Sequence, residues 1–300
     1  MVSEQAVPIR WNATMKRLII LCLVVAAGMV MAETPPSMQG RSSKRGVCVN
    51  QFSEADARAL SPGVSWFYSW YFECTNVSPS VGLEFYPMVW GDAPEYLAGF
   101  ENSLKAGATP SHVLVLNEPN LKGQAFITPQ RSAELYARVE ALAKPRGIKM
   151  IGPHMALGSS TESSITAFDP IEQKDITYTY MIPYLNAFIH HVGGADRLDA
   201  VAVHSYGNMS ELNWLVDMLQ KTYPGKDIWI TEFAWWDAKN EAEEIAFMKE
   251  AVGLFERTPA VKKYAWFMAR MKDNQRMSLL TDQSGELTEL GRTYISLPAH

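Results

Sequence analysis

The sequence predicts an α/β protein, a (β/α)8 TIM barrel that forms a single domain over residues 45–300. Eight short apolar runs alternate with longer stretches whose apolar residues recur every three or four positions. This alternation is typical of parallel strands covered by helices. About 250 residues is also the usual size of such a barrel. An open doubly wound sheet is the alternative, but the segment after the first run, GVCVNQFSEADA, lacks the glycine-rich fingerprint usual in that fold.

The predicted strands are short, and their apolar character is nearly continuous, which indicates burial on both faces. They cover residues 45–49, 64–70, 83–90, 112–116, 149–152, 198–204, 227–231 and 263–267. The spacing between successive runs leaves room for a helix or a loop in each interval.

Three intervals show clear helical patterns. PQRSAELYARVEALAKPRG (129–147) has Pro129 near its start and Gly147 after its end, as helix termini prefer. SELNWLVDMLQKTYPG (210–225) offers Ser210 as the N-cap. NEAEEIAFMKEAVGLFERTP (240–259) has acidic residues early and Pro259 as a stop.

The N-terminal region is expected to be a targeting segment and not part of the fold. Within residues 1–32, Lys16 and Arg17 precede the apolar run LIILCLVVAAGMVM and a small-residue cleavage site at Ala32, which makes Met15 the natural start. The run is shorter than the ~20 residues of a membrane helix. We therefore expect a cleaved signal peptide, a secreted or periplasmic protein without a membrane anchor, and a Pro/Ser-rich linker at 33–44.

Charge and cysteine content restrict the classes of partner. Residues 1–32 hold three basic and one acidic side chain, which leaves 24 basic and 31 acidic residues and a net charge of −7. This balance argues against nucleic acid or anionic lipid as a partner, and we expect a monomer that binds neutral molecules. No CxxC or HExxH spacing is present, so neither a metal nor a cofactor is expected. Cys48 and Cys74 could form a disulfide or remain thiols.

Two of the eight runs end in a glutamate. LVLNEPN places Glu118 after the fourth run, and IWITEF places Glu232 at the end of the seventh. Barrel enzymes carry their chemistry at the carboxyl ends of the strands, so both side chains should face the same mouth. Two carboxyl groups, one protonated and one ionised, are the minimal equipment for glycosidic bond cleavage. Ordinary ion pairing at strand ends is the alternative reading of these acids.

Aromatic and polar residues also gather at the run ends. A flat ring can stack on the apolar face of a sugar while amides and hydroxyls bind its edges. Trp66 and Trp266 could instead fill the barrel interior, and His154 and His204 could be satisfied core residues. The candidate binding residues are Asn50, Trp66, Tyr68, Trp90, Asn117, His154, His204, Tyr206, Trp235 and Trp266.

The motifs together resemble glycoside hydrolase family 128, whose characterised members act on β-1,3-glucans. The resemblance runs from about Arg45 to about Phe267 through RGVCVN, WFYSWY, FYPMVWG, LVLNEPN, DAVAVHSYG, IWITEFAWW and YAWF. It implies an endo-β-1,3-glucanase that works by double displacement with retention of configuration. An exo-acting or β-1,4-specific retaining glycosidase is the alternative among enzymes, and a non-catalytic β-glucan-binding protein is the alternative outside them.

The resemblance also implies a role for each matched position. Glu118 would be the general acid/base, Glu232 the nucleophile, and Asn117 a hydrogen-bond partner of the sugar 2-hydroxyl. His204 and Tyr206 would line the reacting subsite, with Tyr206 holding the nucleophile ionised. Rings expected as sugar platforms are Trp66, Tyr68, Trp90, Trp235 and Trp266.

Overall fold

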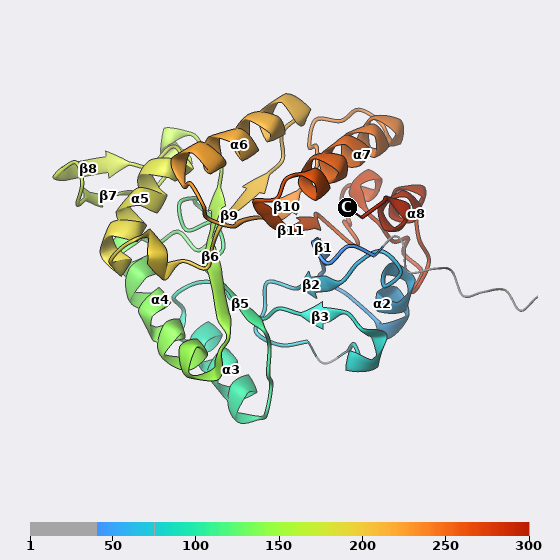
Figure 1. Ribbon diagram of the computed structural model, residues 1–300, viewed down its shortest axis with the longest axis horizontal. Coiled ribbons are helices and arrows are strands. Elements are labelled where there is room, and N and C mark those ends of the chain that lie inside the picture. Colours follow the sequence, from blue (N-terminus) through green and yellow to red (C-terminus); the bar gives the residue numbers. More distant parts are fainter. Residues whose placement is uncertain (1–40, 75, 300) are drawn as a thin grey trace, which may run out of the picture. The chain divides into compact units, whose positions relative to one another are not determined.

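The structure, a computed structural model, describes residues 41–74 and 76–299 (Figure 1). The predicted signal peptide, residues 1–32, lies outside the described residues, as does most of the predicted linker. Within the described part of the chain, no helix is long and apolar enough to cross a bilayer. The described residues form one folded domain.

Nine strands, all parallel to their neighbours, form the central sheet in the order β3-β2-β1-β11-β10-β9-β6-β5-β4. Their bounds are β1 (Arg45–Cys48), β2 (Trp66–Tyr68), β3 (Glu84–Phe85), β4 (Met88–Val89), β5 (His112–Val115), β6 (Lys149–Ala156), β9 (Ala200–Ser205), β10 (Ile228–Phe233) and β11 (Val261–Trp266).

The two outermost strands of this order, β3 and β4, are halves of one extended segment. The amide of Tyr86 donates to Phe67 O at 3.0 Å, and the amide of Leu114 donates to Pro87 O at 2.8 Å. The segment therefore pairs with β2 on one side and β5 on the other, and Pro87 interrupts it because proline has no N–H to donate. The sheet thus closes into a barrel of eight strands, which confirms the predicted fold class and the eight predicted runs.

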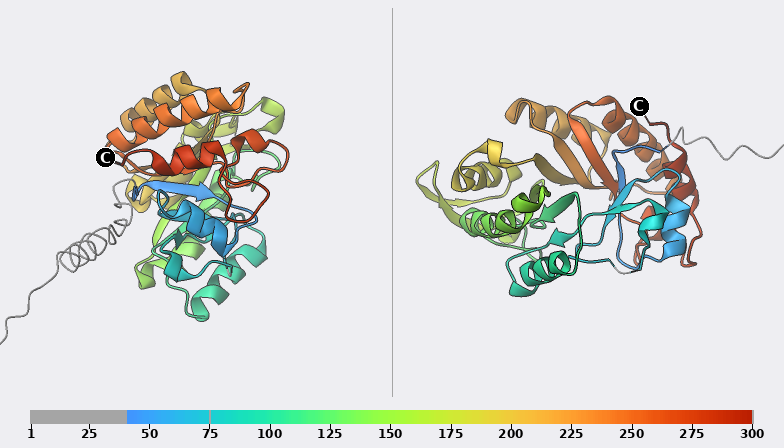
Figure 2. Two further views of the ribbon diagram at one scale, coloured as in Figure 1. Left: turned by 90° about the vertical axis from the view of Figure 1, so that its right-hand side faces the viewer. Right: turned by 60° about the horizontal axis from the view of Figure 1, so that its bottom comes forward.

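Seven helices surround the sheet (Figure 1 and Figure 2). They are α2 (Glu54–Leu60), α3 (Pro94–Lys105), α4 (Pro129–Ala143), α5 (Met181–Val192), α6 (Met209–Thr222), α7 (Glu241–Arg257) and α8 (Glu289–Ser296). The three predicted helices are confirmed as α4, α6 and α7. The predicted N-cap of α6 is wrong by two positions, because Asn208 accepts from the amides of Ser210 and Glu211. Asparagine is as strong an N-cap as serine.

Short elements complete the fold. A two-stranded antiparallel hairpin, β7 (Thr166–Asp169) and β8 (Lys174–Thr177), follows β6 before α5 begins. The sequence patterns did not predict this hairpin, because its strands are short and largely solvent-facing. Single 3₁₀ turns occur at Pro79–Val81, Lys144–Arg146, Thr161–Ser163, Ala195–Arg197 and Gln275–Met277.

The end of the predicted linker belongs to the folded domain. Lys44 Nζ donates to the carbonyls of Phe255, Glu256 and Thr258 at 3.0, 3.0 and 3.2 Å, at the C-terminus of α7. A cation is favourable there because the last carbonyls of a helix have no partner within it. Lys44, the last residue of the predicted linker, is therefore bonded to the folded domain, and the predicted boundary at residue 45 stays a prediction.

The core has two layers, one inside the barrel and one between the barrel and the helices. Trp66 lies inside the barrel, where its ring stacks on Tyr86 at 5.1 Å and contacts Trp229 at 5.6 Å. Trp266 faces the outer layer, 5.0 Å from the Phe233 ring. Both indoles are fully buried, so their prediction as sugar platforms is wrong and the core alternative holds.

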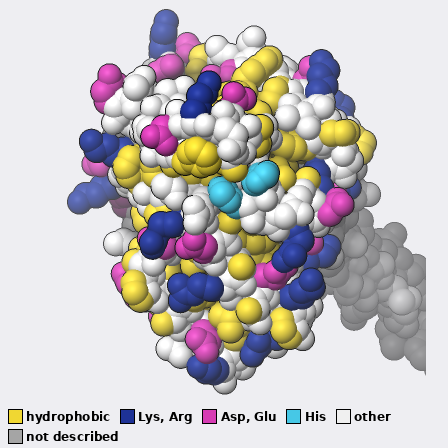
Figure 3. Space-filling model, turned by 90° about the vertical axis from the view of Figure 1, so that its left-hand side faces the viewer, with side chains coloured by type: hydrophobic (Ala, Val, Ile, Leu, Met, Phe, Trp, Pro, Cys, Tyr) yellow, Lys and Arg dark blue, Asp and Glu magenta, His cyan; other side chains and the backbone are white. Residues whose placement is uncertain are grey.

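On the face shown in Figure 3, acidic and basic side chains are interspersed. Such a mixture is usual for the surface of a globular domain. It gives this face no field of a single sign. The expectation that nucleic acid is not a partner stays a prediction.

Candidate active site

Glu118 is positioned by an unusual backbone at the end of β5. Leu116 and Glu118 both have left-handed φ angles, 68° and 43°, which are costly for residues other than glycine. The neighbouring strands hold this conformation, because the Asn117 amide donates to Trp90 O at 2.8 Å and the Glu118 amide donates to His154 O at 2.7 Å. The backbone therefore turns at the strand end, and the Glu118 side chain reaches the cleft at the barrel mouth.

Glu232 is positioned by a bulge in β10. The register of β10 against β9 shifts between Ile230 and Glu232. Ile230 and Phe233 belong to the outer core, whereas Thr231 bonds His154 inside the barrel at 2.8 Å and Glu232 lines the cleft at the mouth. Two consecutive residues therefore face the interior, which regular alternation forbids and a bulge allows.

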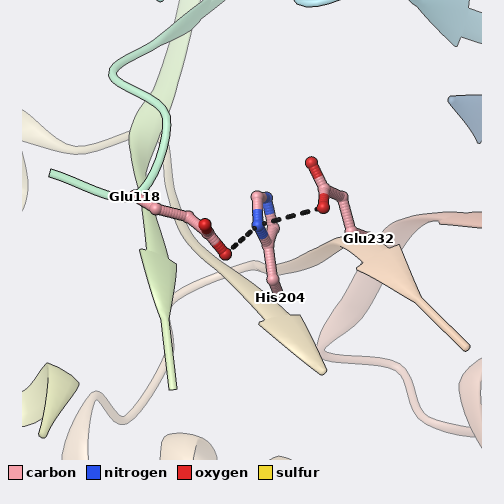
Figure 4. Close-up of side chains that lie close together, drawn as sticks. All are labelled: Glu118, His204 and Glu232. Carbon is pink, nitrogen blue, oxygen red and sulfur yellow. Dashed lines mark hydrogen bonds and ion pairs between the residues drawn. The ribbon is translucent and has the colours of Figure 1, made fainter. Parts of the chain in front are cut away.

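The two acids meet across His204, which comes from β9 (Figure 4). His204 Nδ1 lies 2.9 Å from Glu118 Oε1 and 3.3 Å from Glu232 Oε2. One ligand-type atom from each of the three residues lies within 4.8 Å of the others. The exposed fractions of Glu118, His204 and Glu232 are only 7%, 1% and 4%. The structure therefore brings together the two glutamates predicted from their strand ends.

Three uncharged donors surround the Glu232 carboxylate. Tyr68 Oη donates to Oε1 at 3.0 Å, Trp70 Nε1 donates to Oε1 at 2.7 Å, and the Tyr206 hydroxyl donates to Oε2. Burial raises the pKa of Glu232, while His204 and the hydrogen bonds from Tyr206 and Trp70 act to lower it. Donors to a carboxylate favour its ionised form. The site therefore opposes the protonation that burial alone would cause.

The two histidines of the region differ in environment. Burial acts to lower the pKa of His204, but the charges of Glu232 and Glu118 outweigh it, and that pKa is raised. Burial lowers the pKa of His154 to about 3. His154 bonds Thr231 Oγ1 at 2.8 Å and Ile151 O at 3.0 Å. Its prediction as a binding residue is wrong: it is a buried neutral histidine that supports the strand carrying Glu232.

A cleft of about 930 Å³ opens above the two acids. Of the predicted binding residues, it contains Trp90, Asn117, His204 and Tyr206. It also contains residues that the prediction did not select. These are Trp70, Leu121, Gln124, Ala156, Leu157, Gly158, Gly207, Glu211, Trp236, Asp237, Phe267 and Met268.

Three more predicted binding residues lie elsewhere. Asn50 lines two neighbouring polar clefts instead of this one. Tyr68 is fully buried beneath Glu232 and bonds the acid. The Trp235 ring packs at 6.1 Å from the Phe247 ring, whereas the next residue, Trp236, is 49% exposed and lines the cleft.

A simple signal could have found two of the missed residues. Side chains two positions apart on a strand share a face. Trp70 continues the face of Trp66 and Tyr68, and Phe267 follows the outward-facing Trp266 by one position. Applying this alternation strictly would have selected Trp70 and Phe267 for the mouth of the barrel.

Among the described residues, Glu118, His204 and Glu232 form the one group of acids, cysteines and histidines whose geometry could hold a metal ion. The expectation that no metal is needed stays a prediction. Cys48 and Cys74 are free thiols, so the alternative of a disulfide between them is not formed. Cys48 lies under the site, with Sγ 3.3 Å from Thr231 O, and burial raises its pKa.

Comparison with known proteins identifies the relatives of this chain. The family model described as glycosyl hydrolase catalytic core matches residues 46–294. A crystal structure of a glycoside hydrolase family 128 (subgroup II) endo-β-1,3-glucanase from Pseudomonas viridiflava is 32% identical, with a TM-score of 0.70, covering 87% of this chain and 100% of that one. The corresponding enzyme from Sorangium cellulosum is 30% identical, with a TM-score of 0.70 and coverages of 86% and 99%.

A more distant structure shares the fold. It is a family 128 (subgroup III) curdlan-specific exo-β-1,3-glucanase from Blastomyces gilchristii, 24% identical, with a TM-score of 0.66 and coverages of 86% and 100%. Among curated proteins, no match to the sequence is found.

The donors around Glu232 lead to a prediction about its protonation. Replacing Tyr206 with Phe removes a donor that favours the ionised carboxylate, so we expect the pKa of Glu232 to rise by about one unit. The measurement is a pH titration of glutamate labelled with ¹³C at the carboxyl carbon, with the Glu232 signal assigned from a Glu232→Gln variant. Tyr223→Phe is the matched control, because its hydroxyl bonds Asn186 away from the cleft. An unchanged or lower pKa in Tyr206→Phe would contradict the role of this hydroxyl.

Proposed function

The chain belongs to the glycosyl hydrolase catalytic core family and to glycoside hydrolase family 128, and we propose that it hydrolyses β-1,3-glucan internally with retention of configuration. The linkage is supported by the two relatives at 30% and 32% identity, both of which are described as endo-β-1,3-glucanases. The mechanism is supported by the geometry of this chain's own two glutamates.

The separation of the two acids is the observation that carries the mechanism. Carboxylate oxygens of Glu118 and Glu232 lie within 4.8 Å of each other. Retaining glycosidases place the two carboxyl groups about 5–5.5 Å apart, whereas inverting enzymes need about 6.5–9.5 Å to admit a water molecule. The short separation therefore favours direct attack by one glutamate on the sugar.

The roles of the acids follow from their surroundings. The three donors around Glu232 favour it as the ionised member of the pair, so it attacks the anomeric carbon while Glu118 gives its proton to the departing glycosidic oxygen. This forms a glycosyl ester on Glu232 and leaves Glu118 ionised. Glu118 then takes a proton from water, whose oxygen attacks the anomeric carbon and releases Glu232. Both acids return to their starting states.

The cleft also has the groups needed to bind a sugar chain. Trp70, Trp90, Trp236 and Phe267 provide rings along the cleft, which can stack on glucose faces. Asn117 Nδ2 donates to Gln124 Oε1 at 3.0 Å, while its buried Oδ1 has no partner among the described residues. A hydroxyl donated by the sugar at the reacting position would satisfy this oxygen, in accord with the role expected for Asn117.

Location and oligomeric state complete the proposal. The apolar run within residues 1–32 of the sequence supports export to the exterior or the periplasm, where a polymeric glucan would be met. Both acids and the rings of the cleft belong to one folded domain, so the proposed reaction needs no second chain.

The experiment that tests the function is digestion of linear β-1,3-, β-1,4- and mixed-linkage glucans, with product lengths followed over time. We expect cleavage of the β-1,3 polymer to oligosaccharides of several lengths at early times. Release of glucose alone would favour the exo-acting alternative, and preference for the β-1,4 polymer would favour the other linkage. Proton NMR of the first product should show the β-anomer, and an initial α-anomer would contradict retention.

Replacing each acid with its amide should give different losses. Glu232→Gln removes the nucleophile, so hydrolysis of every substrate should fall by at least ~10³-fold while oligosaccharide binding persists. Glu118→Gln removes the proton donor, so turnover of glucan should fall far more than the first, glycosylation step on aryl glycosides with good leaving groups. Steady-state and burst kinetics with both substrate types measure this difference. Equal losses of the glycosylation step would argue against an acid role for Glu118, and retained binding without any wild-type turnover would favour the non-catalytic alternative.

Two adjacent tryptophans provide a matched test of the cleft. Trp236→Ala removes an exposed ring from the cleft, so KM for β-1,3 oligosaccharides should rise by about tenfold with little change in thermal stability. Trp235→Ala removes a ring packed on Phe247, so the melting temperature should fall with little change in KM. Calorimetry and steady-state kinetics on both variants check the assignment. The reverse pattern would restore the original prediction that Trp235 is the platform.

A further inference from the structure

His204 presents a single ring nitrogen to both acids. Its Nδ1 lies 2.9 Å from Glu118 Oε1 and 3.3 Å from Glu232 Oε2. Its Nε2 is buried and has no hydrogen-bond partner among the described residues. A hydrogen on Nδ1 has two acceptors within reach, whereas a hydrogen on Nε2 would be a buried donor without an acceptor, which is costly. The geometry therefore favours the tautomer with the hydrogen on Nδ1.

Few described groups near His204 could stabilise the negative charge of Glu118 or Glu232. The described residues that line the cleft include no lysine or arginine, and four of them are acidic: Glu118, Glu211, Glu232 and Asp237. From β6, His154 faces His204 with ring centroids 6.2 Å apart, and it is neutral because burial lowers its pKa to about 3. Directly after the strand of His204, the nearby Tyr206 hydroxyl is directed to Glu232. Among the residues that the structure describes, the Nδ1–H group is thus the one donor placed to serve both acids.

The negative charge moves between these two acids during a double displacement. In the free enzyme Glu232 is the carboxylate and Glu118 carries the proton on the oxygen that faces the substrate. In the glycosyl-enzyme Glu232 is an ester and Glu118 is the carboxylate. Glu118 and Glu232 together carry one negative charge in both states, and that charge has moved from one side of His204 to the other.

We propose that His204 is a positioning residue whose Nδ1–H hydrogen-bonds the ionised acid in each half of the reaction, first Glu232 and then Glu118. This proposal rests on the proposed retaining function. The imidazole does not have to move far, because both acceptors already lie within 3.3 Å of Nδ1. No proton leaves His204 in either step, so the proton balance of the reaction remains that of the two glutamates and water. His204 stabilises whichever carboxylate is present and thereby matches each acid to its role.

The proposal predicts that the acid limbs of two pH profiles, that of kcat/KM and that of kcat, both shift when His204 is replaced. The acid limb of kcat/KM reports ionisation of Glu232 in the free enzyme. With an activated aryl β-glycoside of a β-1,3-linked glucose oligomer, hydrolysis of the glycosyl-enzyme limits turnover, and the acid limb of kcat reports ionisation of Glu118. Loss of a donor makes each carboxylate less favourable, so His204→Leu should move both limbs to higher pH by about one unit.

Two conservative variants make the test specific. An asparagine places its side-chain N–H near the position of Nδ1, so His204→Asn should return both limbs toward the wild-type values. A glutamine places its N–H nearer the position of Nε2, so His204→Gln should behave like His204→Leu. This pair differs by one methylene, so it tests the proposal even where His204→Leu fails to fold.

Each other outcome would overturn the proposal. Movement of the kcat/KM limb alone would assign the donor to Glu232, and movement of the kcat limb alone would assign it to Glu118. Unmoved limbs with lower kcat in all variants would make His204 a packing residue. The wild-type enzyme first shows, by a burst of released aryl group, on which activated substrate hydrolysis of the glycosyl-enzyme limits turnover, and that substrate is then used for the variants. An inverted product from the wild-type enzyme would contradict the retaining function itself.

Discussion

The main constraint on this site is that two carboxyl groups, those of Glu118 and Glu232, are buried close together at the barrel mouth. Burial disfavours the charged form of an acid, and two acids within 4.8 Å of each other disfavour it further. The fold opposes this cost for Glu232 by placing hydrogen-bond donors from the end of β2 and from the residues after β2 and β9 around its carboxylate. It also places His204 between the acids. The strained φ angles near Glu118 and the bulge before Glu232 are the backbone cost of aiming both side chains at the same point.

Strand β2 and its extension show how the barrel separates stability from chemistry. Trp66, Tyr68 and Trp70 share one face at successive levels of the interior. Trp66 stacks among the rings of the lower barrel, Tyr68 is buried and bonds Glu232, and Trp70 bonds Glu232 and lines the cleft. Three side chains on one face therefore have three roles: Trp66 packs the core, Tyr68 supports Glu232, and Trp70 reaches the cleft. A rigid lower core is what allows the upper level to carry polar groups in fixed positions.

The sequence predicted those features that a local pattern determines. Continuous apolar runs predicted the strands, and the two glutamates at run ends predicted the acids, because parallel strands bring their carboxyl ends to one mouth. The errors concern orientation within a strand. Trp266 and Trp235 were chosen although Phe267 and Trp236 reach the cleft, one position further along in each case. Strict alternation would have corrected the choice of Trp266, but the bulge in β10 changes the alternation before Trp235 and Trp236 without any marker in the residue types.

The charge of the cleft is connected to the kind of ligand it can hold. Its described lining contains four acidic residues and no lysine or arginine, within a chain whose formal net charge is −5. An anionic polysaccharide would meet repulsion without a compensating cation, whereas a neutral glucan offers hydroxyl donors that carboxylates and amide oxygens accept. The same absence of lysine and arginine increases the importance of neutral donors, because Tyr68, Trp70 and Tyr206 stabilise the Glu232 carboxylate without a salt bridge. A carboxylate paired with a fixed cation would be a weaker nucleophile. The absence of lysine and arginine from the described lining of the cleft and the use of neutral donors therefore both keep Glu232 reactive.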